Sequence, residues 1–375
     1  MPKVLIICDD FRMGGIQRLA LDQAYELNRR RESCQILVLG VMPDSLTSSF
    51  EKSEKELIES LGIQITYLPG SRIRQYINLR KLLVEEKYNY VFGHSLRGTV
   101  LTWLIRLVIK SNLTIITTIH QLPSMSNKIQ RVRRMAYSQF SDKLYIYSAV
   151  AKKDWDLQRN RNPFIRLISI RKKIELCRNG VFIPRLSLKE INFESQSRTI
   201  KRFVFIGRLT AWKGLKTFLD IAQLPQFKNI EILLVTPTDP REFLINVDKN
   251  LIDRISCEVG KSLSQINFYT GDLHIYPVNP TAIDSEFFVE GVSINVLEMA
   301  CLGVPSLITK GGSDTWPELV DFGIISEVDW SNLSAVAKII DRDITVPPAK
   351  VIELCRSLLD IGRNLDFLLR EYKEV

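Results

Sequence analysis

Short apolar runs recur along the chain, and most of the segments between them carry apolar residues at helical spacing. This alternation is typical of parallel β-sheets with helices on both faces, because a crossover between parallel strands usually contains a helix. The chain is therefore expected to be an α/β protein with doubly wound parallel sheets. The expected strands cover 4–8, 35–39, 63–68, 90–93, 113–119 and 143–147 in the first half, and 203–207, 230–235, 266–270, 286–289 and 305–309 in the second.

The length of the chain predicts two domains, because 375 residues are more than one hydrophobic core usually holds. A polar stretch runs to Arg198 after the turn at Asn179-Gly180, and such stretches mark domain boundaries. We place the first domain at residues 1–185 and the second at residues 186–358.

Composition limits the class of protein. The six cysteines are scattered without a C-x-x-C pair, so reduced thiols are expected rather than a disulfide frame or a zinc site. No uncharged run approaches the roughly 18 residues of a membrane span, and Val4–Cys8 is too short for the core of a signal peptide. The expected location is cytoplasmic, either soluble or peripheral to the inner face of the cell membrane.

The net charge of +9 is distributed unevenly. Residues 1–200 hold 33 Lys and Arg against 18 Asp and Glu, whereas residues 201–375 hold 18 against 24. The basic half predicts an anionic partner, but nucleic acid is disfavoured because there is neither an aromatic platform nor a helix-turn-helix pattern. A helix expected at 127–140 carries Arg131, Arg133 and Arg134. This basic face is either solvated or in contact with a phosphate-bearing acceptor at an anionic membrane surface.

The stretch from Glu290 to Pro305 predicts a loop, a short helix and a strand. Backbone N–H groups of Val292, Ser293 and Ile294 at the start of this helix are suited to a diphosphate, since the helix macrodipole also favours negative charge there. Glu298 lies about one turn further in, where it can accept hydrogen bonds from ribose hydroxyls. The alternative interpretation is that the carboxylates of Glu290 and Glu298 are ordinary surface groups near the start of a helix.

A second motif lies at the start of the expected second domain. Phe203–Leu209 is an apolar run that ends in Gly-Arg, and Lys213 and Gly214 follow shortly after it. This pattern predicts a strand that leads into a loop at the carboxyl edge of the sheet, where open α/β sheets bind their ligands. The strand ends at 235–237 and 270–272 are expected at the same edge, near the nucleotide base.

Together these motifs resemble a known family. Gly207-Arg208-Leu209 with Lys213-Gly214, followed by Glu290 and Glu298 separated by seven residues, is similar to the retaining GT-B glycosyltransferases of the family-4 (glycosyl transferases group 1) type. The resemblance implies two Rossmann-like domains facing a central cleft, and a C-terminal helix within 359–375 that packs back on the first domain. It also implies a nucleotide-sugar donor, with a UDP-sugar favoured over a GDP-sugar, and an acceptor hydroxyl on a cell-surface polysaccharide or lipid-linked glycan.

The resemblance also assigns roles to residues. Arg208 and Lys213 would stabilise the departing nucleoside diphosphate, so neither a metal nor another cofactor is required. Glu290 would hold hydroxyls of the transferred sugar, and Glu298 would hold those of ribose. Gly14-Gly15 match the position of the family's N-terminal glycine loop, near the donor phosphates and the acceptor.

Two histidines follow expected strands of the first domain. The family places a histidine close to the transferred sugar after the strand at 113–119, so His120 is predicted to lie in the active site. His94 follows the strand at 90–93, and it has either a role in the active site or a purely structural role.

Three further points qualify the resemblance. Asp154-Trp155-Asp156 and Asp341-Arg342-Asp343 have the form of the metal motif of the other glycosyltransferase fold, but neither follows a convincing apolar strand. Ser293 replaces the family's second glycine, so the identity of the donor cannot be carried over. The alternatives are a GT-B nucleotide-sugar epimerase or hydrolase, which would need further acid/base residues, and a non-catalytic nucleotide- or glycan-binding module.

Overall fold

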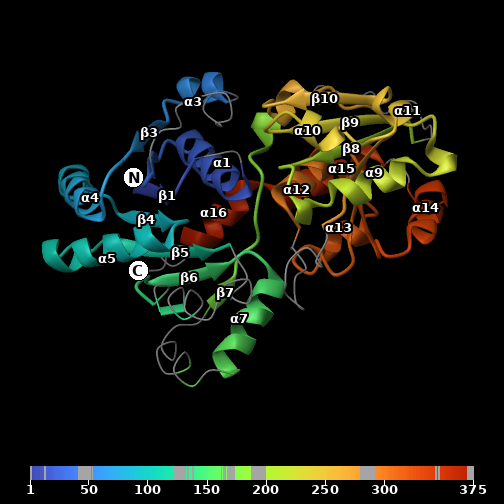
Figure 1. Cartoon of the computed structure of the whole chain (residues 1–375). Coiled ribbons are helices and arrows are strands. Elements are labelled where there is room, and N and C mark those ends of the chain that lie inside the picture. The colour runs from blue at the N-terminus through green and yellow to red at the C-terminus, as the bar shows by residue number, and fades with distance from the viewer. Residues whose placement is uncertain are drawn as a thin grey trace. The chain divides into compact units, whose positions relative to one another are not determined.

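The computed structural model describes residues 2–11, 14–40, 52, 54–120, 132, 135–136, 139–161, 163, 166, 174–186, 200–278, 292–342, 344 and 347–369. The chain divides into two compact units (Figure 1). Unit 1 combines Met1–Phe182 with Ile361–Val375, and unit 2 holds Ile183–Asp360. Each unit contains a parallel sheet flanked by helices, so each is a Rossmann-like domain.

The sheet of unit 1 has seven strands in the order β3-β2-β1-β4-β5-β6-β7 among its described residues. The chain runs outward from β1 to β3 and then restarts at β4, on the other side of β1. The carboxyl ends of β1 and β4 therefore meet at the topological switch point, where such sheets bind ligands. The strands are β1 (Lys3–Cys8), β2 (Ser33–Val38), β3 (Gln64–Tyr67), β4 (Tyr90–Gly93), β5 (Thr114–Ile119), β6 (Lys143–Ile146) and β7 (Ile174–Leu176).

Helix α16, from the end of the chain, packs against α1 within unit 1 (Figure 1). The Arg30 guanidinium contacts Asp366 at 2.7 Å. The backbone at Gly180 packs against the first residue of α16, Ile361, so closely that a Cβ on Gly180 would lie 2.6 Å from the Ile361 Cα. The helices of unit 1 are α1 (Gly15–Arg29), α3 (Lys55–Ser60), α4 (Arg72–Glu86), α5 (Leu96–Ile109), α7 (Ala149–Arg161) and α16 (Ile361–Leu369).

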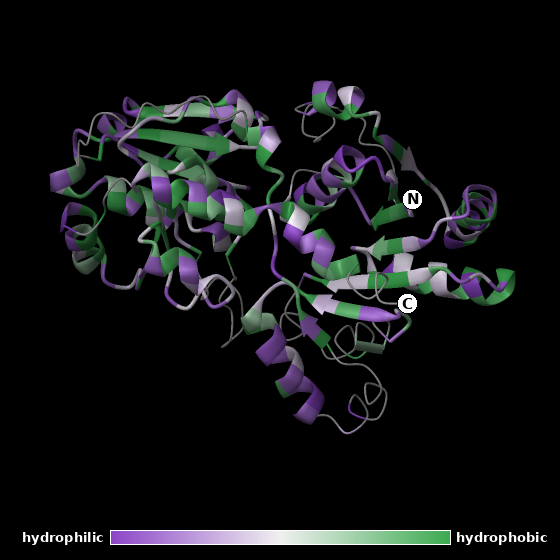
Figure 2. Ribbon diagram, turned by 180° about the vertical axis from the view of Figure 1, so that it is seen from behind, coloured by the Kyte–Doolittle hydropathy of each residue, from purple (hydrophilic) through white to green (hydrophobic). Residues whose placement is uncertain are grey.

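The strands of both sheets are mostly hydrophobic, whereas helix α7 is mostly hydrophilic (Figure 2). Parallel strands covered on both faces need such continuous apolar sequences, because neither face meets water. In unit 1 the interior strand β1 is buried from Val4 to Cys8. One of its hydrophobic clusters joins Leu5 and Ile7 to Leu37, Leu79, Val91 and Ile105.

The sheet of unit 2 has six strands in the order β10-β9-β8-β11-β12-β13 among its described residues. Its switch point lies between β8 and β11, by the same rule as in unit 1. Short 3₁₀ helices include η3 (Ile183–Leu186) and η4 (Ala211–Lys213). The strands are β8 (Arg202–Ile206), β9 (Glu231–Thr236), β10 (Ile255–Val259), β11 (Asp272–Tyr276), β12 (Ser306–Thr309) and β13 (Ile325–Val328).

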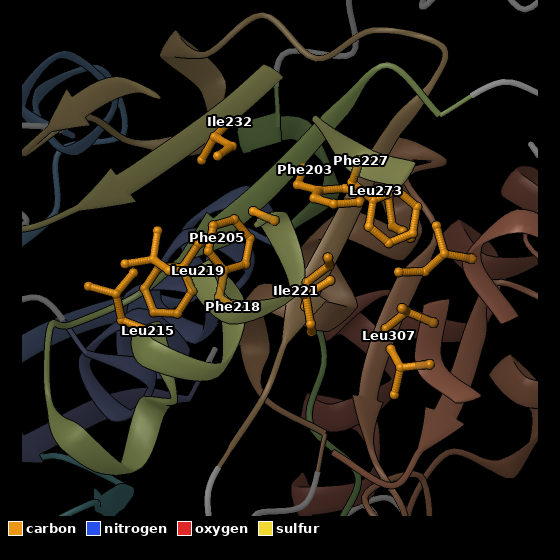
Figure 3. Packing of buried hydrophobic residues seen from close by; sticks show 14 of the residues in the cluster. Phe203, Phe205, Leu215, Phe218, Leu219, Ile221, Phe227, Ile232, Leu273 and Leu307 are labelled. Carbon is orange, nitrogen blue, oxygen red and sulfur yellow. The ribbon is translucent and has the colours of Figure 1, made fainter. Parts of the chain in front are cut away.

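The core of unit 2 lies between its sheet and the helices that flank it. Phe203 and Phe205 of β8 meet Phe227 and Phe218 at ring-centroid distances of 5.2 and 5.5 Å (Figure 3). The helices of unit 2 are α9 (Leu215–Ala222), α10 (Arg241–Leu244), α11 (Lys249–Ile252), α12 (Ile294–Leu302), α13 (Pro317–Asp321), α14 (Leu333–Arg342) and α15 (Ala349–Leu359).

Nine of the expected strands overlap strands of the structure, whereas β7, β10 and β13 were not predicted. The strand expected at 266–270 is wrong, because β11 begins only at Asp272. Asp272 pairs in register with Arg202 at the start of β8, so 270–272 lie at the amino edge of the sheet, opposite the predicted edge. Asp272 there accepts two hydrogen bonds from the Arg202 guanidinium, at 2.8 and 2.6 Å. The strand expected at 286–289 lies outside the described residues.

Within the part of the chain that the structure describes, none of the helices combines the length and the hydropathy that a bilayer crossing requires.

Candidate functional site

The start of helix α12 lies at the switch point of unit 2. Asn295, in its first turn, donates from Nδ2 to the Ile206 carbonyl oxygen at 3.2 Å, and Ile206 is the last residue of β8. Ser293 is the N-cap, but its hydroxyl does not cap the helix. The buried Ser293 Oγ has no hydrogen-bond partner among the described residues. A helix start with its N–H groups and an unused hydroxyl is suited to an anion.

The loop that follows β8 carries the two predicted cations beside this helix start. Arg208 is exposed directly after Gly207, whose φ of 150° lies in the region that favours glycine. Lys213 ends η4 and is 8% exposed. Gly214 has a φ of 73°, and a Cβ there would lie 1.8 Å from the Pro277 carbonyl oxygen. The close approach at Gly214 therefore fixes the loop against the end of β11.

Lys213 is held by aromatic side chains. Its ammonium contacts the hydroxyl of Tyr276, the last residue of β11. The same ammonium lies 4.1 Å from the ring centroid of Trp212 and 4.6 Å from that of Tyr276. Such cation–π contacts help to hold the ammonium group in place. Tyr276 was not among the predicted site residues, because the strand that carries it was expected six residues earlier.

The loop after β12 completes this edge of unit 2. Glu327 accepts hydrogen bonds from the backbone N–H groups of Gly311 at 3.0 Å and Ser313 at 2.8 Å, and from the Ser313 hydroxyl at 2.5 Å. Partial burial alone would raise the pKa of Glu327, but these hydrogen bonds outweigh it and lower the pKa. A cavity of about 10 Å³, room for one water molecule, is lined here by Tyr276, Val278, Val292, Val296, Ile308, Thr309 and Gly312.

Glu298 lies inside α12 and is only 2% exposed. Its Oε1 accepts from Nη2 of Arg185 at 2.6 Å, and Arg185, on η3, is 3% exposed. Buried carboxylates of this kind are normally paired, because an isolated buried charge is costly. The ribose role of Glu298 stays a prediction. Arg185 is a partner that sequence reasoning missed, since it lies 113 residues away.

In unit 1 the predicted residues gather at the other switch point. Gly14 is the N-cap of α1, and Gly15 is the first residue of that helix. His94 follows β4, and its backbone N–H donates to the Ile7 carbonyl of β1 at 3.0 Å. His94 Nδ1 lies 2.9 Å from Nε2 of His120, which follows β5. Burial lowers the pKa of His94 to about 3, and burial together with His94 lowers that of His120 well below its ordinary value.

Some predictions fall elsewhere. Glu290 and Arg131, Arg133 and Arg134 lie outside the described residues, as does Asp343. Asp154-Trp155-Asp156 lies in the middle of α7 and not after a strand. Among the side chains that the structure describes, no three His, Cys, Asp or Glu gather as metal ligands.

The fold is that of the GT-B glycosyltransferases, in which one chain carries two Rossmann-like domains. No protein-family model and no curated protein matches the sequence. Solved structures match it over its whole length. The fold resembles HepE of Anabaena in complex with UDP-glucose, with a TM-score of 0.67, 13% identity and 100% of both chains covered.

Two further matches have the same character. Sucrose-phosphate synthase from Thermosynechococcus elongatus has a TM-score of 0.69 and 14% identity, covering 100% of this chain and 99% of that one. The lipopolysaccharide outer core galactosyltransferase WaaB has a TM-score of 0.63 and 13% identity, covering 100% of both chains. At such identities the likeness establishes the fold and not the substrate.

Proposed function

We propose that the protein is a retaining glycosyltransferase that moves a sugar from a nucleotide-sugar donor to an acceptor hydroxyl. The observation that carries the proposal is the switch point of unit 2. The start of α12, tied by Asn295 to the end of β8, lies beside a loop that carries Arg208 and Lys213. A helix N-terminus and two cations on one edge of a Rossmann-like sheet are suited to a diphosphate.

The fold supports a UDP-sugar as the donor. HepE, which has this fold over the full length of both chains, was solved with UDP-glucose bound. The diphosphate would contact the N–H groups of Val292, Ser293 and Ile294, with Ser293 Oγ as a further donor. Glu298 would contact the ribose, and Glu290 the hydroxyls of the transferred sugar. Gly14 and Gly15 of unit 1 would lie near the phosphates and the acceptor.

Charge stabilisation drives the proposed reaction. As the bond to the anomeric carbon breaks, negative charge develops on the leaving phosphate oxygen. A cation about 4 Å away contributes on the order of 4 kcal/mol at an effective dielectric near 20, before desolvation. Arg208 donates two hydrogen bonds to the phosphate in a bidentate contact, and Lys213 acts as a point charge. The leaving phosphate takes the acceptor proton on the same face of the sugar, so configuration is retained. We propose that the reaction needs neither a metal ion nor another cofactor.

The acceptor is proposed to be a cell-surface polysaccharide or lipid-linked glycan, made at the cytoplasmic face of the membrane. WaaB, which acts on lipopolysaccharide outer core, shares the fold. The proposed membrane contact is the basic face expected at 127–140, because Arg131, Arg133 and Arg134 there suit an anionic bilayer. Binding to phosphatidylglycerol vesicles should weaken when these three arginines are replaced by alanine; unchanged binding would argue against this surface.

Thermal unfolding with UDP, GDP, ADP and dTDP tests the donor site. A ligand present at 100 times its dissociation constant should add about 2.7 kcal/mol of stability. We expect stabilisation by UDP that survives EDTA and weakens in Arg208→Ala. Lys216→Ala is the matched control, because this side chain on α9 is 89% exposed and its removal changes the charge equally. Failure of all four nucleotides to stabilise the protein would reject the donor site.

Turnover separates the proposed reaction from its alternatives. With UDP-glucose and a glycosyl acceptor, UDP should be released only when the acceptor is present, and NMR of the product should show the anomeric configuration of the donor. Release of free glucose without acceptor would indicate a hydrolase, and a changed sugar would indicate an epimerase. Binding without any turnover would indicate a non-catalytic module.

A further inference from the structure

A chain of hydrogen bonds between polar side chains runs through unit 1 and ends on His120. It starts at the Arg178 backbone carbonyl and passes through Asn364 of α16, Gln23 of α1 and His94. Gln23, His94 and Asn364 are 0%, 8% and 4% exposed. Because water has little access to these side chains, each hydrogen-bond donor must meet an acceptor that belongs to the protein.

The backbone fixes the orientation of both amides. Nδ2 of Asn364 lies 2.7 Å from the Arg178 carbonyl oxygen, which can only accept. Oδ1 of Asn364 therefore accepts from Nε2 of Gln23 at 3.0 Å. Gln23 consequently presents its carbonyl oxygen, and not its amide nitrogen, to Nε2 of His94 at 2.9 Å.

The amide orientation fixes the proton on each ring. His94 must donate from Nε2, and because its pKa is lowered to about 3 the ring is neutral, which leaves a lone pair on Nδ1. Nδ1 of His94 lies 2.9 Å from Nε2 of His120, and two lone pairs cannot share that contact. The proton between them therefore belongs to Nε2 of His120. Thr118 Oγ1, 2.9 and 3.1 Å from the same two nitrogens, fits this assignment because a hydroxyl both donates and accepts.

We infer that Gln23 and His94 are positioning residues that hold His120 as its neutral Nε2–H tautomer, so that Nδ1 accepts a hydrogen bond from a substrate hydroxyl. The contact of His120 with substrate rests on the proposed function; the tautomer does not. A neutral ring with a lone pair on Nδ1 favours a sugar hydroxyl and disfavours a phosphate oxygen, which offers no proton. His120 thus selects for the sugar or the acceptor alcohol and not for the leaving diphosphate.

The tautomers can be read directly by NMR. The chain has three histidines, so imidazole ¹⁵N labelling gives three ring patterns in a long-range ¹H–¹⁵N correlation spectrum. His120→Asn and His274→Gln assign the peaks. We expect His94 and His120 to show the neutral Nε2–H pattern between pH 6 and 8, a range that spans the ordinary histidine pKa of about 6.5. An Nδ1–H pattern or a protonated ring for His120 would overturn the inference, whatever the enzyme does.

Gln23→Leu breaks the chain between Asn364 and His94. We expect the His120 pattern to shift towards Nδ1–H and kcat/KM for sugar transfer to fall about tenfold, the scale of one lost hydrogen bond. Tyr147→Phe is the control for the tautomer, because it removes a hydroxyl that contacts Gln23 Nε2, at 3.2 Å, and Asn364, but keeps the bonds from Asn364 through Gln23 to His94 and the ring beside His120. An unchanged His120 pattern in folded Gln23→Leu would contradict the positioning role.

The two proposals fail separately. If no nucleotide sugar is used but His120 carries its proton on Nε2, only the proposed function is rejected. If transfer occurs but His120 carries its proton on Nδ1, only the positioning role is rejected. Circular dichroism in the near ultraviolet checks that each variant is folded, and the wild-type spectrum decides the tautomer even if Gln23→Leu does not fold.

Discussion

The ion pair between Glu298 and Arg185 combines an expected site residue with a structural contact in unit 2. Both side chains are almost fully buried, with exposed fractions of 3% and 1%. Removing one partner of such a pair takes a counter-ion away from the other buried charge, whereas an exposed pair contributes little. The stability of unit 2 and any nucleotide contact of Glu298 therefore depend on the same carboxylate.

Glu298→Ala should destabilise the protein by about 3–5 kcal/mol in urea unfolding, because the Arg185 guanidinium stays buried. The matched control is Glu353→Ala, which breaks the pair with Arg356 on helix α15, where Glu353 is 69% exposed. That change should cost at most about 1 kcal/mol. Equal losses in the two variants would contradict the burial argument. Nucleotide binding is better tested with Glu298→Gln, which keeps a hydrogen-bond acceptor.

Glu327 should make stability depend on pH. Its pKa is lower in the folded protein than in the unfolded chain, so its contribution is fully present above the unfolded value and is lost as pH falls through the folded one. The difference in unfolding temperature between wild type and Glu327→Leu should therefore be largest near pH 7 and should shrink below about pH 4, near the ordinary glutamate pKa. A difference that is constant between pH 3 and 7 would contradict this assignment.

Single residues mark the limit of what the sequence predicts. Arg208, Lys213 and the start of α12 lie on the loop and helix that the sequence predicts, because each is next to a turn signal, and their roles stay predictions. Arg185, Gln23 and Asn364 were missed because their partners are far away in the chain and no local pattern distinguishes them. The histidine pair was half found, because the sequence places both rings after strands but gives no distance between them.

Among elements, the loop from β8 to α9 makes a close backbone contact at Gly214, where a Cβ would lie 1.8 Å from the Pro277 carbonyl oxygen. Gly214→Ala should prevent this loop from closing on Pro277, because the new Cβ would overlap a carbonyl oxygen. Gly323→Ala is a matched control, since its φ of 70° is nearly the same as the 73° of Gly214 but nothing lies within 4 Å of its Cβ. The control should lose about 1–2 kcal/mol in urea unfolding, the cost of the left-handed conformation alone.

Gly214→Ala should lose distinctly more stability than this control and should also lose stabilisation by UDP. Equal unfolding free energies for the two variants would show that the contact with Pro277 is relieved at little cost. The comparison isolates the close approach, because the backbone conformations of the two glycines are matched.

Most strands of the two sheets could be predicted, because buried parallel strands have continuous apolar sequences. The error at 266–270 has a physical cause. Ile266 and Phe268 are buried in the connection before the strand, so they gave an apolar run there without pairing in the sheet. β11 itself contains two buried polar residues, Asp272 and His274, which contact Arg202 and Ser306. Because of these polar residues, β11 lacks the continuous apolar sequence by which buried strands are predicted.

At the scale of the whole molecule, unit 1 is built from two separate parts of the chain. Ile361, Leu365 and Leu368 of α16 are at most 1% exposed, and each such side chain contributes about 1.5–3 kcal/mol by burial. Truncation after Asp360 should therefore destabilise unit 1 by several kcal/mol and leave unit 2 nearly unchanged. Hydrogen exchange measured by mass spectrometry resolves the two, and equal loss of protection in both units would contradict this division of the chain.

The divided sequence of unit 1 also sets an order of events during synthesis. The ribosome adds Ile361 only after it has made residues 1–360, so the earlier part of unit 1 has to wait for its last helix. Asn364, which orients the amide of Gln23, arrives with that helix. Residues 1–182 of a nascent chain therefore lack the amide that orients Gln23, and the inferred tautomer of His120 is fixed only after this last helix has docked.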